Sequence, residues 1–190
     1  MFYKERERHP LSISNPALLI VDVQSYFFQK HSPAYISGSE RVLLNIERLV
    51  NALRKVKIPI IATIHEGGNS QMFKWWNNTV DKIWTELMIN QSSVDYILKK
   101  NTYDAFYNTD LENILSSLSI DQLLITGVMT HLCCETTARS GFVRGYNIVM
   151  IEDCLWDKDE WYHYSSLKNL AHGFATITTS EEIIKTFLKY

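Results

Sequence analysis

Short apolar runs alternate with amphipathic stretches along almost the whole chain of 190 residues, and this alternation limits its possible folds more than any other feature. The apolar runs have the length and continuity of strands that are buried on both faces. The stretches between them place apolar residues three and four positions apart, as amphipathic helices do. This order predicts βαβ units, and so an α/β chain with a doubly wound, three-layer α/β/α architecture around a mostly parallel, six-stranded sheet.

The ends of the apolar runs and turn residues such as Gly127 set the bounds of the expected elements. Strands are expected at residues 17–22, 60–64, 94–98, 122–126, 147–151 and 175–178. Helices are expected at residues 41–56, 111–118, 131–144, 160–171 and 180–188, the last with Ser180 as its N-cap. With 46% hydrophobic residues the chain can bury a sizeable core, so residues 1–190 are expected to form one domain, with residues 1–14 as an N-terminal extension.

Charge and composition argue against several classes of partner. The formal net charge is −2 and the 19 basic residues are scattered, so no basic stripe is available to follow a nucleic-acid backbone. No run approaches the roughly 20 apolar residues of a membrane span, and residues 1–9 are too charged for the core of a signal peptide. We therefore expect a cytoplasmic protein that acts on a small molecule, with neither nucleic acid nor membrane as a partner.

Three chemically useful groups follow the ends of expected strands. Asp22 ends the first strand, Lys100 follows the third, and the segment 130–134 follows the fourth. In doubly wound sheets, ligands bind beyond the carboxyl ends of the strands. The three groups are therefore expected to meet on one rim of the sheet.

Cys133 is the candidate nucleophile among three cysteines that form no disulfide framework. If Thr130 is an N-cap, Cys133 is the third helical residue, where the helix dipole and unpaired N–H groups stabilise a thiolate and can also receive an oxyanion. Asp22 can accept the thiol proton, and Lys100 can keep that carboxylate ionised. The ordinary alternatives are a buried structural cysteine, a solvated strand-end carboxylate and a surface lysine.

Three motifs together resemble the isochorismatase-like cysteine hydrolase superfamily, which includes nicotinamidases, N-carbamoylsarcosine amidases and isochorismatases. They are ALLIVDVQSYF at residues 17–27, KNTYDAF at residues 100–106, and GVMTHLCCETTAR at residues 127–139. The resemblance runs from about Asn15 to the end of the chain and implies a catalytic triad of Asp22, Lys100 and Cys133. It also implies a cis peptide between Val128 and Met129, with the N–H groups of Met129 and Cys133 forming an oxyanion hole.

The same resemblance suggests further residues of the site and the assembly of the protein. Candidates for lining the substrate pocket are Gln24, Phe27, His65, Trp84, Tyr103 and His131. The tryptophan-rich segment 72–88 is expected to form helices over the rim. His65 stands alone where nicotinamidases gather several histidines, so no metal site and no cofactor are expected. Family members are commonly oligomeric, so a homo-oligomer is expected.

The sequence thus favours hydrolysis of a C–N bond in a small amide, carbamoyl or imide-like substrate through a thioester on Cys133. The substrate itself is not indicated. One alternative is vinyl-ether hydrolysis of the isochorismatase type, with Asp22 as the acid and no thiol nucleophile. An alternative of another class is a thiol redox or binding protein that uses Cys133 and Cys134. Asp104 and Cys134 depart from the residues usual in the family, and their roles are open at this point.

Overall fold

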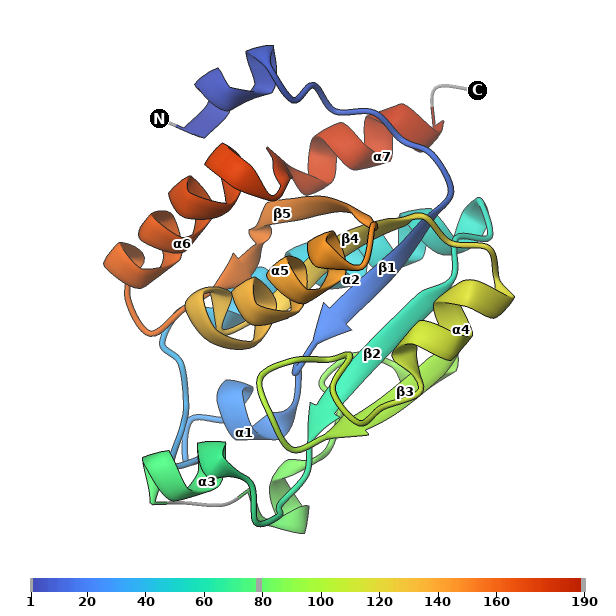
Figure 1. Cartoon of the computed structure of the whole chain (residues 1–190). Helices are drawn as coiled ribbons and strands as arrows, with labels where there is room; N and C mark the ends of the chain where they lie inside the picture. The colour runs from blue at the N-terminus through green and yellow to red at the C-terminus, as the bar shows by residue number, and fades with distance from the viewer. Residues whose placement is uncertain (1, 78–79, 189–190) are drawn as a thin grey trace.

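A computed structural model describes residues 2–77 and 80–188 and shows a six-stranded sheet between two layers of helices (Figure 1). The strand order is β3-β2-β1-β4-β5-β6, and every pairing between neighbours is parallel. The predicted doubly wound α/β architecture is therefore confirmed. The sheet expected to be mostly parallel is parallel throughout.

The strands and helices have the following bounds. The strands are β1 (Pro16–Val21), β2 (Ile60–His65), β3 (Tyr96–Lys100), β4 (Gln122–Val128), β5 (Asn147–Trp156) and β6 (Thr176–Thr178). The α-helices are α1 (Ser25–Phe28), α2 (Ser39–Lys55), α3 (Gln71–Trp76), α4 (Leu111–Ser117), α5 (Glu135–Val143), α6 (Glu160–Gly173) and α7 (Ser180–Leu188). The remaining helical segments are the 3-10 helices η1 (Phe2–Glu7), η2 (Lys82–Trp84) and η3 (Gln91–Ser93) and the π-helical turn η4 (Thr130–Cys134).

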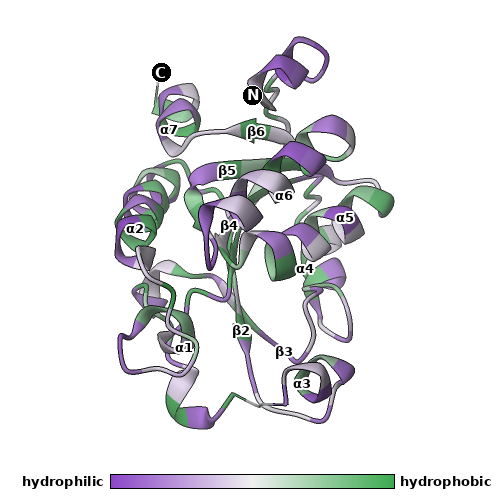
Figure 2. Cartoon of the chain, turned by 90° about the vertical axis from the view of Figure 1, so that its left-hand side faces the viewer, coloured by the Kyte–Doolittle hydropathy of each residue, from purple (hydrophilic) through white to green (hydrophobic). Residues whose placement is uncertain are grey.

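Alternate residues of the central strand β1 belong to two separate apolar clusters. Leu18 and Ile20 pack with α2 and α7 on one face of the sheet, while Leu19 and Val21 pack with α4, α5 and α6 on the other. Figure 1 shows α5 and α6 in front of the sheet and α2 behind it. Figure 2 shows hydrophobic and hydrophilic residues alternating around α2, as expected for a helix that buries one side. Both faces of β1 are thus covered, which explains its uninterrupted apolar sequence.

Several element boundaries differ from the sequence-based expectation. The third strand lies at Tyr96–Lys100 rather than residues 94–98, so Lys100 ends the strand instead of following it. The fifth strand continues to Trp156, five residues beyond its expected end at 151. The helix expected at residues 131–144 is divided into the π-helical turn η4 and α5, and Ser180 is the first residue of α7 rather than its cap. Local patterns locate an element better than its ends, because tertiary contacts decide where pairing stops.

The carboxyl ends of the strands form the rim on which the site is built. Beyond the ends of β1 and β2 lie α1 and α3 (Figure 1). At the opposite side, the N-terminal segment packs against the last helices, with Arg6 and Glu182 in an ion pair of 2.7 Å. Among the described residues, no helix has the length and apolar character needed to cross a membrane.

Candidate active site

The three residues predicted to form a triad approach one another from three strand ends. Asp22 directly follows β1 in a left-handed conformation with φ of 54°, which asparagine and aspartate adopt more readily than most residues. Lys100 is the last residue of β3, and Cys133 lies in η4, just after β4. All three are almost fully buried, with exposed fractions of 0% for Asp22, 4% for Lys100 and 2% for Cys133.

Gly127 permits β1 and β4 to approach each other closely at this rim. It pairs with Val21 in the register of the two strands and has φ of 114°, a conformation that favours glycine. A Cβ atom at this position would lie 2.0 Å from the Val21 carbonyl oxygen. The lack of a side chain at Gly127 thus lets the strand before Asp22 lie against the strand that leads to Cys133.

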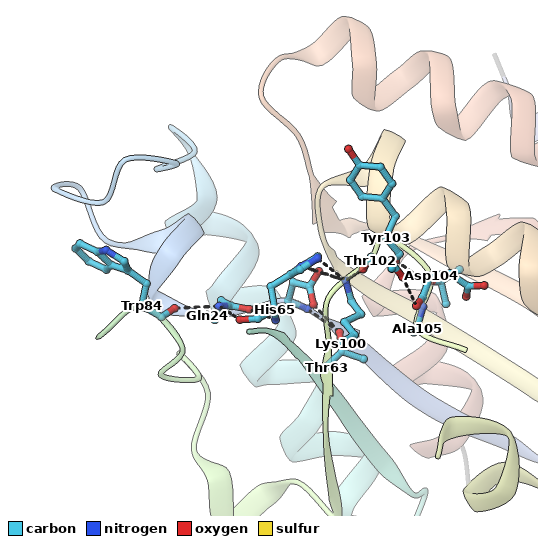
Figure 3. Close-up of polar contacts among 11 residues, drawn as sticks. Gln24, Thr63, His65, Trp84, Lys100, Thr102, Tyr103, Asp104 and Ala105 are labelled. Atoms are coloured by element: carbon cyan, nitrogen blue, oxygen red, sulfur yellow. Dashed lines mark hydrogen bonds and ion pairs between the residues drawn. The ribbon is translucent and has the colours of Figure 1, made fainter. Parts of the chain in front are cut away.

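Asp22 is the centre of a buried polar network, and its partners Thr63, His65 and Lys100 are labelled in Figure 3. Its Oδ2 atom accepts hydrogen bonds from Lys100 Nζ at 2.7 Å and from His65 Nδ1 at 2.8 Å. Its Oδ1 atom accepts a hydrogen bond from the Thr63 hydroxyl at 2.7 Å. Lys100 Nζ also donates to the Thr102 carbonyl at 2.9 Å. Three donors on the carboxylate and a second acceptor for the ammonium fix the relative positions of the two charges.

The Cys133 thiol lies beside this ion pair. The Sγ atom, an oxygen of Asp22 and a ring nitrogen of His65 all lie within 4.8 Å of one another. Burial raises the pKa of the Cys133 thiol, and the nearby Lys100 ammonium opposes this effect without cancelling it. In the resting site the sulfur is therefore a protonated thiol that faces an ionised carboxylate.

The two charged partners hold each other ionised despite burial. Burial by itself would raise the pKa of Asp22, but Lys100 and His65 outweigh it and hold the pKa well below its usual range. Burial likewise would lower the pKa of Lys100, but the charge of Asp22 prevails and raises it. Burial lowers the pKa of His65, so its ring is neutral. The site thus contains one ion pair, one neutral imidazole and one thiol.

Among the described residues, Asp22, His65 and Cys133 have the chemistry and spacing of metal ligands. The ammonium of Lys100 already lies in their midst, 2.7 Å from Asp22 Oδ2 and 3.1 Å from His65 Nδ1. A divalent ion in this cluster would have to displace that ammonium. The lysine therefore supplies the positive charge that a metal would otherwise bring.

The turn that carries Cys133 has the expected cis peptide, between Val128 and Met129. Its start differs from the expectation, because Met129 rather than Thr130 is the cap residue, and Cys133 is the fourth residue of a π-helical turn. The Met129 carbonyl accepts hydrogen bonds from the N–H groups of Leu132 and Cys134, at 3.2 Å each. These donors lie on either side of Cys133.

Two pocket candidates, Gln24 and Phe27, make extensive contacts within the protein. The side-chain amide of Gln24 is fully engaged: its nitrogen donates to the carbonyls of His65 at 3.0 Å and Trp84 at 2.9 Å, and its oxygen accepts from the His65 N–H at 2.6 Å. Gln24 therefore joins the end of β2 to the segment at Trp84, as Figure 3 shows. Phe27 is buried in the apolar cluster beside α2. The polar atoms of Gln24 are therefore engaged within the protein, and a place for either side chain in the substrate pocket stays a prediction.

Two other candidates, Tyr103 and Trp84, make contacts with neighbouring aromatic side chains. Tyr103 accepts a hydrogen bond from the Trp76 indole at 2.6 Å, and its ring points away from Lys100 in Figure 3. Trp84 meets the network through its carbonyl, while its ring lies 5.5 Å from that of His31. The prediction that helices cover the rim at residues 72–88 agrees with α3 and η2, although residues 78–79 lie outside the described part.

His131 turns away from the cluster around Cys133. Its Nδ1–H group donates to Asp157 at 2.7 Å, and its ring stacks on Tyr162 with centroids 4.3 Å apart. Asp157 follows β5 and Tyr162 lies on α6, so His131 faces that side of the molecule. Side chains two positions apart on a helical turn point in different directions, and a place for His131 in the substrate pocket stays a prediction.

Three residues have contacts that the sequence analysis did not assign. Thr63 donates to Asp22 and lies two residues before His65, on the same side of β2, a period-two signal that was available in the sequence. Asp104 accepts hydrogen bonds from the Ser140 hydroxyl and the Phe106 N–H, so it joins the loop after β3 to α5. Cys134 is fully buried in the apolar cluster of α4, α5 and α6.

Comparison with known proteins yields consistent matches over nearly the whole chain. Residues 16–182 match the model of the isochorismatase domain. Nicotinamidase 3 of Arabidopsis thaliana is 29% identical over 197 residues, which cover 98% of this chain and 95% of that protein. N-carbamoylsarcosine amidase of an Arthrobacter species is 21% identical over 187 residues, which cover 90% of this chain and 71% of the relative.

Solved structures share the fold. The crystal structure of a cysteine hydrolase from Pseudomonas syringae pv. phaseolicola superposes with a TM-score of 0.85 and covers 95% of each chain. Its sequence is 24% identical, so this likeness concerns the arrangement of strands and helices alone.

Proposed function

Because the chain belongs to the isochorismatase family of hydrolases, we propose that it cleaves the C–N bond of a small amide, carbamoyl or imide-like substrate. One observation carries the proposal: a thiol, a carboxylate and an ammonium from three strand ends lie together, buried, with the ion pair at 2.7 Å. Amide hydrolysis requires a nucleophile and groups that move protons, and these side chains supply both.

In the proposed reaction, Asp22 accepts the thiol proton while the sulfur of Cys133 forms a bond to the substrate carbonyl carbon. The resulting tetrahedral oxyanion receives hydrogen bonds from the N–H groups of Met129 and Cys133. The proton held at Asp22 then moves to the nitrogen, the C–N bond breaks, and ammonia or an amine leaves. Water attacks the thioester, which releases the acid and returns the proton to the sulfur. Lys100 stabilises the negative charge on sulfur and carboxylate throughout.

Burial sets a condition on this reaction. The thiol keeps its proton in the resting site, so proton transfer accompanies attack on a bound substrate rather than preceding it. Because the site is closed to solvent, water does not compete with the substrate for the charged groups. Since the reacting side chains are almost inaccessible to solvent, a substrate that reaches the thiol enters a site from which bulk water is largely excluded.

A screen for ammonia release from primary amides and carbamoyl compounds tests the proposal. The panel includes nicotinamide and N-carbamoylsarcosine, because the names of two relatives refer to them. Cys133→Ala is expected to abolish turnover of any substrate found, and Cys154→Ala on β5 is the matched control that should retain it. Ammonia release by Cys133→Ala at the wild-type rate would remove the assignment of the nucleophile.

The vinyl-ether alternative makes a different demand on Asp22, which would have to be protonated before it could act as an acid. The ion pair with Lys100 holds Asp22 in the ionised form and so favours amide hydrolysis. Release of pyruvate from isochorismate by Cys133→Ser enzyme would support the alternative instead, because that reaction needs no thiol.

A further inference from the structure

The π-helical turn η4 is hydrogen-bonded to a buried carboxylate that takes no part in the proposed reaction. Asp157 has an exposed fraction of 0% and follows β5. Its carboxylate accepts hydrogen bonds from the His131 backbone N–H at 2.8 Å, from His131 Nδ1 at 2.7 Å and from the Lys158 N–H at 2.7 Å. Both the backbone and the side chain of one residue of the turn are thus bound to the same group.

Helix α6 adds a second attachment at the neighbouring residue. The Thr130 hydroxyl lies 2.9 Å from His163 Nδ1, and the Thr130 carbonyl accepts a hydrogen bond from the Ser166 hydroxyl at 3.3 Å. Both partners on α6 are buried, and burial lowers the pKa of His163 to about 4, so its ring is neutral. Of the three residues that bind η4 in this way, Asp157, His163 and Ser166, Asp157 therefore carries the charge.

We propose that Asp157 is a positioning residue, whose carboxylate fixes the turn so that the Cys133 sulfur stays beside Asp22 and Lys100. The inference rests on the proposed function for the role of Cys133. Asp157 acts through the His131 backbone, because His131 and Cys133 are two positions apart in the turn and face different sides. A buried carboxylate is tolerated where donors surround it, and two of its donors belong to the turn itself.

The negative charge of Asp157 allows a positioning role to be distinguished from a direct electrostatic effect on Cys133, because the two predict different directions for the shift in the Cys133 pKa. Removing a negative charge favours a thiolate, so loss of the Asp157 charge alone should lower the pKa of Cys133. Loss of position should do the opposite, because the sulfur would move away from the Lys100 ammonium. The two explanations therefore predict shifts in opposite directions when the carboxylate is replaced.

Alkylation of the thiol by iodoacetamide measures this shift without a substrate. The rate at Cys133 is followed by mass spectrometry of the cleaved protein between pH 6 and pH 10. We expect Asp157→Asn to slow alkylation about tenfold or more, since displacement of a reacting group by about 1 Å costs that much or more. We also expect its pH profile to move to higher pH. A wild-type rate, or a profile at lower pH, would overturn the proposal.

The carboxylate of Asp153, which lies on β5, provides a matched control. Asp153 accepts hydrogen bonds from the Ser180 N–H at 2.7 Å and the Ser180 hydroxyl at 2.6 Å, so it holds the start of α7 as Asp157 holds η4. Asp153→Asn should lower the melting temperature while Cys133 alkylation keeps its rate and profile. An equal loss of Cys133 reactivity in both variants would show a general effect on stability and count against the proposal.

Two substitutions at His131 keep the test valid if Asp157→Asn folds poorly. The side-chain nitrogen of asparagine occupies about the place of Nδ1, so His131→Asn retains a donor to Asp157, whereas His131→Leu removes it. We expect near-wild-type alkylation in the first variant and slow alkylation in the second. Equal rates in both would contradict a role for the side-chain bond.

The outcomes for the two proposals can be separated. If wild-type Cys133 reacts faster than Cys134 and Cys154 and Asp157→Asn removes that advantage, positioning holds even when no amide in the panel is hydrolysed. If hydrolysis occurs and Asp157→Asn leaves both alkylation and turnover unchanged, only the positioning role fails. If wild-type Cys133 reacts no faster than Cys134 and Cys154, the positioning role is overturned, while the proposed function is decided by ammonia release alone.

Discussion

Replacing Lys100 with methionine should destabilise the protein in a pH-dependent way. The substitution removes the cation 2.7 Å from Asp22 and leaves a fully buried carboxylate. Coulomb's law gives a gross attraction of about 6 kcal/mol at this distance with an effective dielectric constant of about 20. Breaking a buried pair by removing one partner costs about 3–5 kcal/mol. Because Thr63 and His65 still donate to the carboxylate, we expect about 3 kcal/mol at pH 8.

The sign of the pH dependence follows from the two states of Asp22. In the wild type its pKa in the folded state is depressed, so the pair contributes stability above the unfolded pKa of about 3.9, and this is lost as pH falls through the folded pKa. In Lys100→Met burial raises the folded pKa of Asp22, so stability is retained below about pH 4 and is lost as pH rises through the raised value. The difference between the two proteins should therefore be small in acid and grow with pH.

Urea unfolding at pH 5 to 8, followed by circular dichroism, measures this difference. The double variant Asp22→Asn/Lys100→Met removes both charges and should recover most of the loss, with little dependence on pH. Lys99→Met is the matched control: Lys99 also forms a 2.7 Å ion pair, with Glu66, but its side chain is 63% exposed, so the cost should stay below about 1 kcal/mol. A pH-independent loss in Lys100→Met, or a double variant as unstable as the single one, would refute the reasoning.

Three further substitutions test other parts of the rim. Gly127→Ala places a methyl group against the Val21 backbone. We expect the unfolding free energy to fall by about 3 kcal/mol or more, because of strain and displacement of a strand, and hydrolysis to decrease. Unchanged urea unfolding would disprove the close approach. Gln24→Leu leaves the His65 N–H without its acceptor and should cost about 2 kcal/mol, measured by thermal unfolding, whereas a neutral result would show that water replaces the amide. Cys134→Val keeps an apolar side chain in the core and should retain hydrolysis; loss of activity with an unchanged melting temperature would favour the redox alternative.

The sequence by itself determined the layers and the edge of the sheet that carries the site. The periodicity of apolar residues is a local property, so strands buried on both faces and helices buried on one side can be recognised from short windows. Asp22, Lys100 and Cys133 each lie at or just beyond the end of such a run, and parallel strands end on the same edge. This argument predicts that the three side chains converge, although it gives no distances.

The tertiary structure alone decided which groups complete the network and which candidates leave it. The contacts of His65 and Thr63 with Asp22 depend on the register of β1 and β2, and a shift of one residue would turn these side chains to the other face. Register is set by packing along the whole sheet, between segments that are distant in the sequence. For the same reason the side-chain bonds of Gln24 and the turn of His131 toward Asp157 could be found only after the strands had been placed side by side.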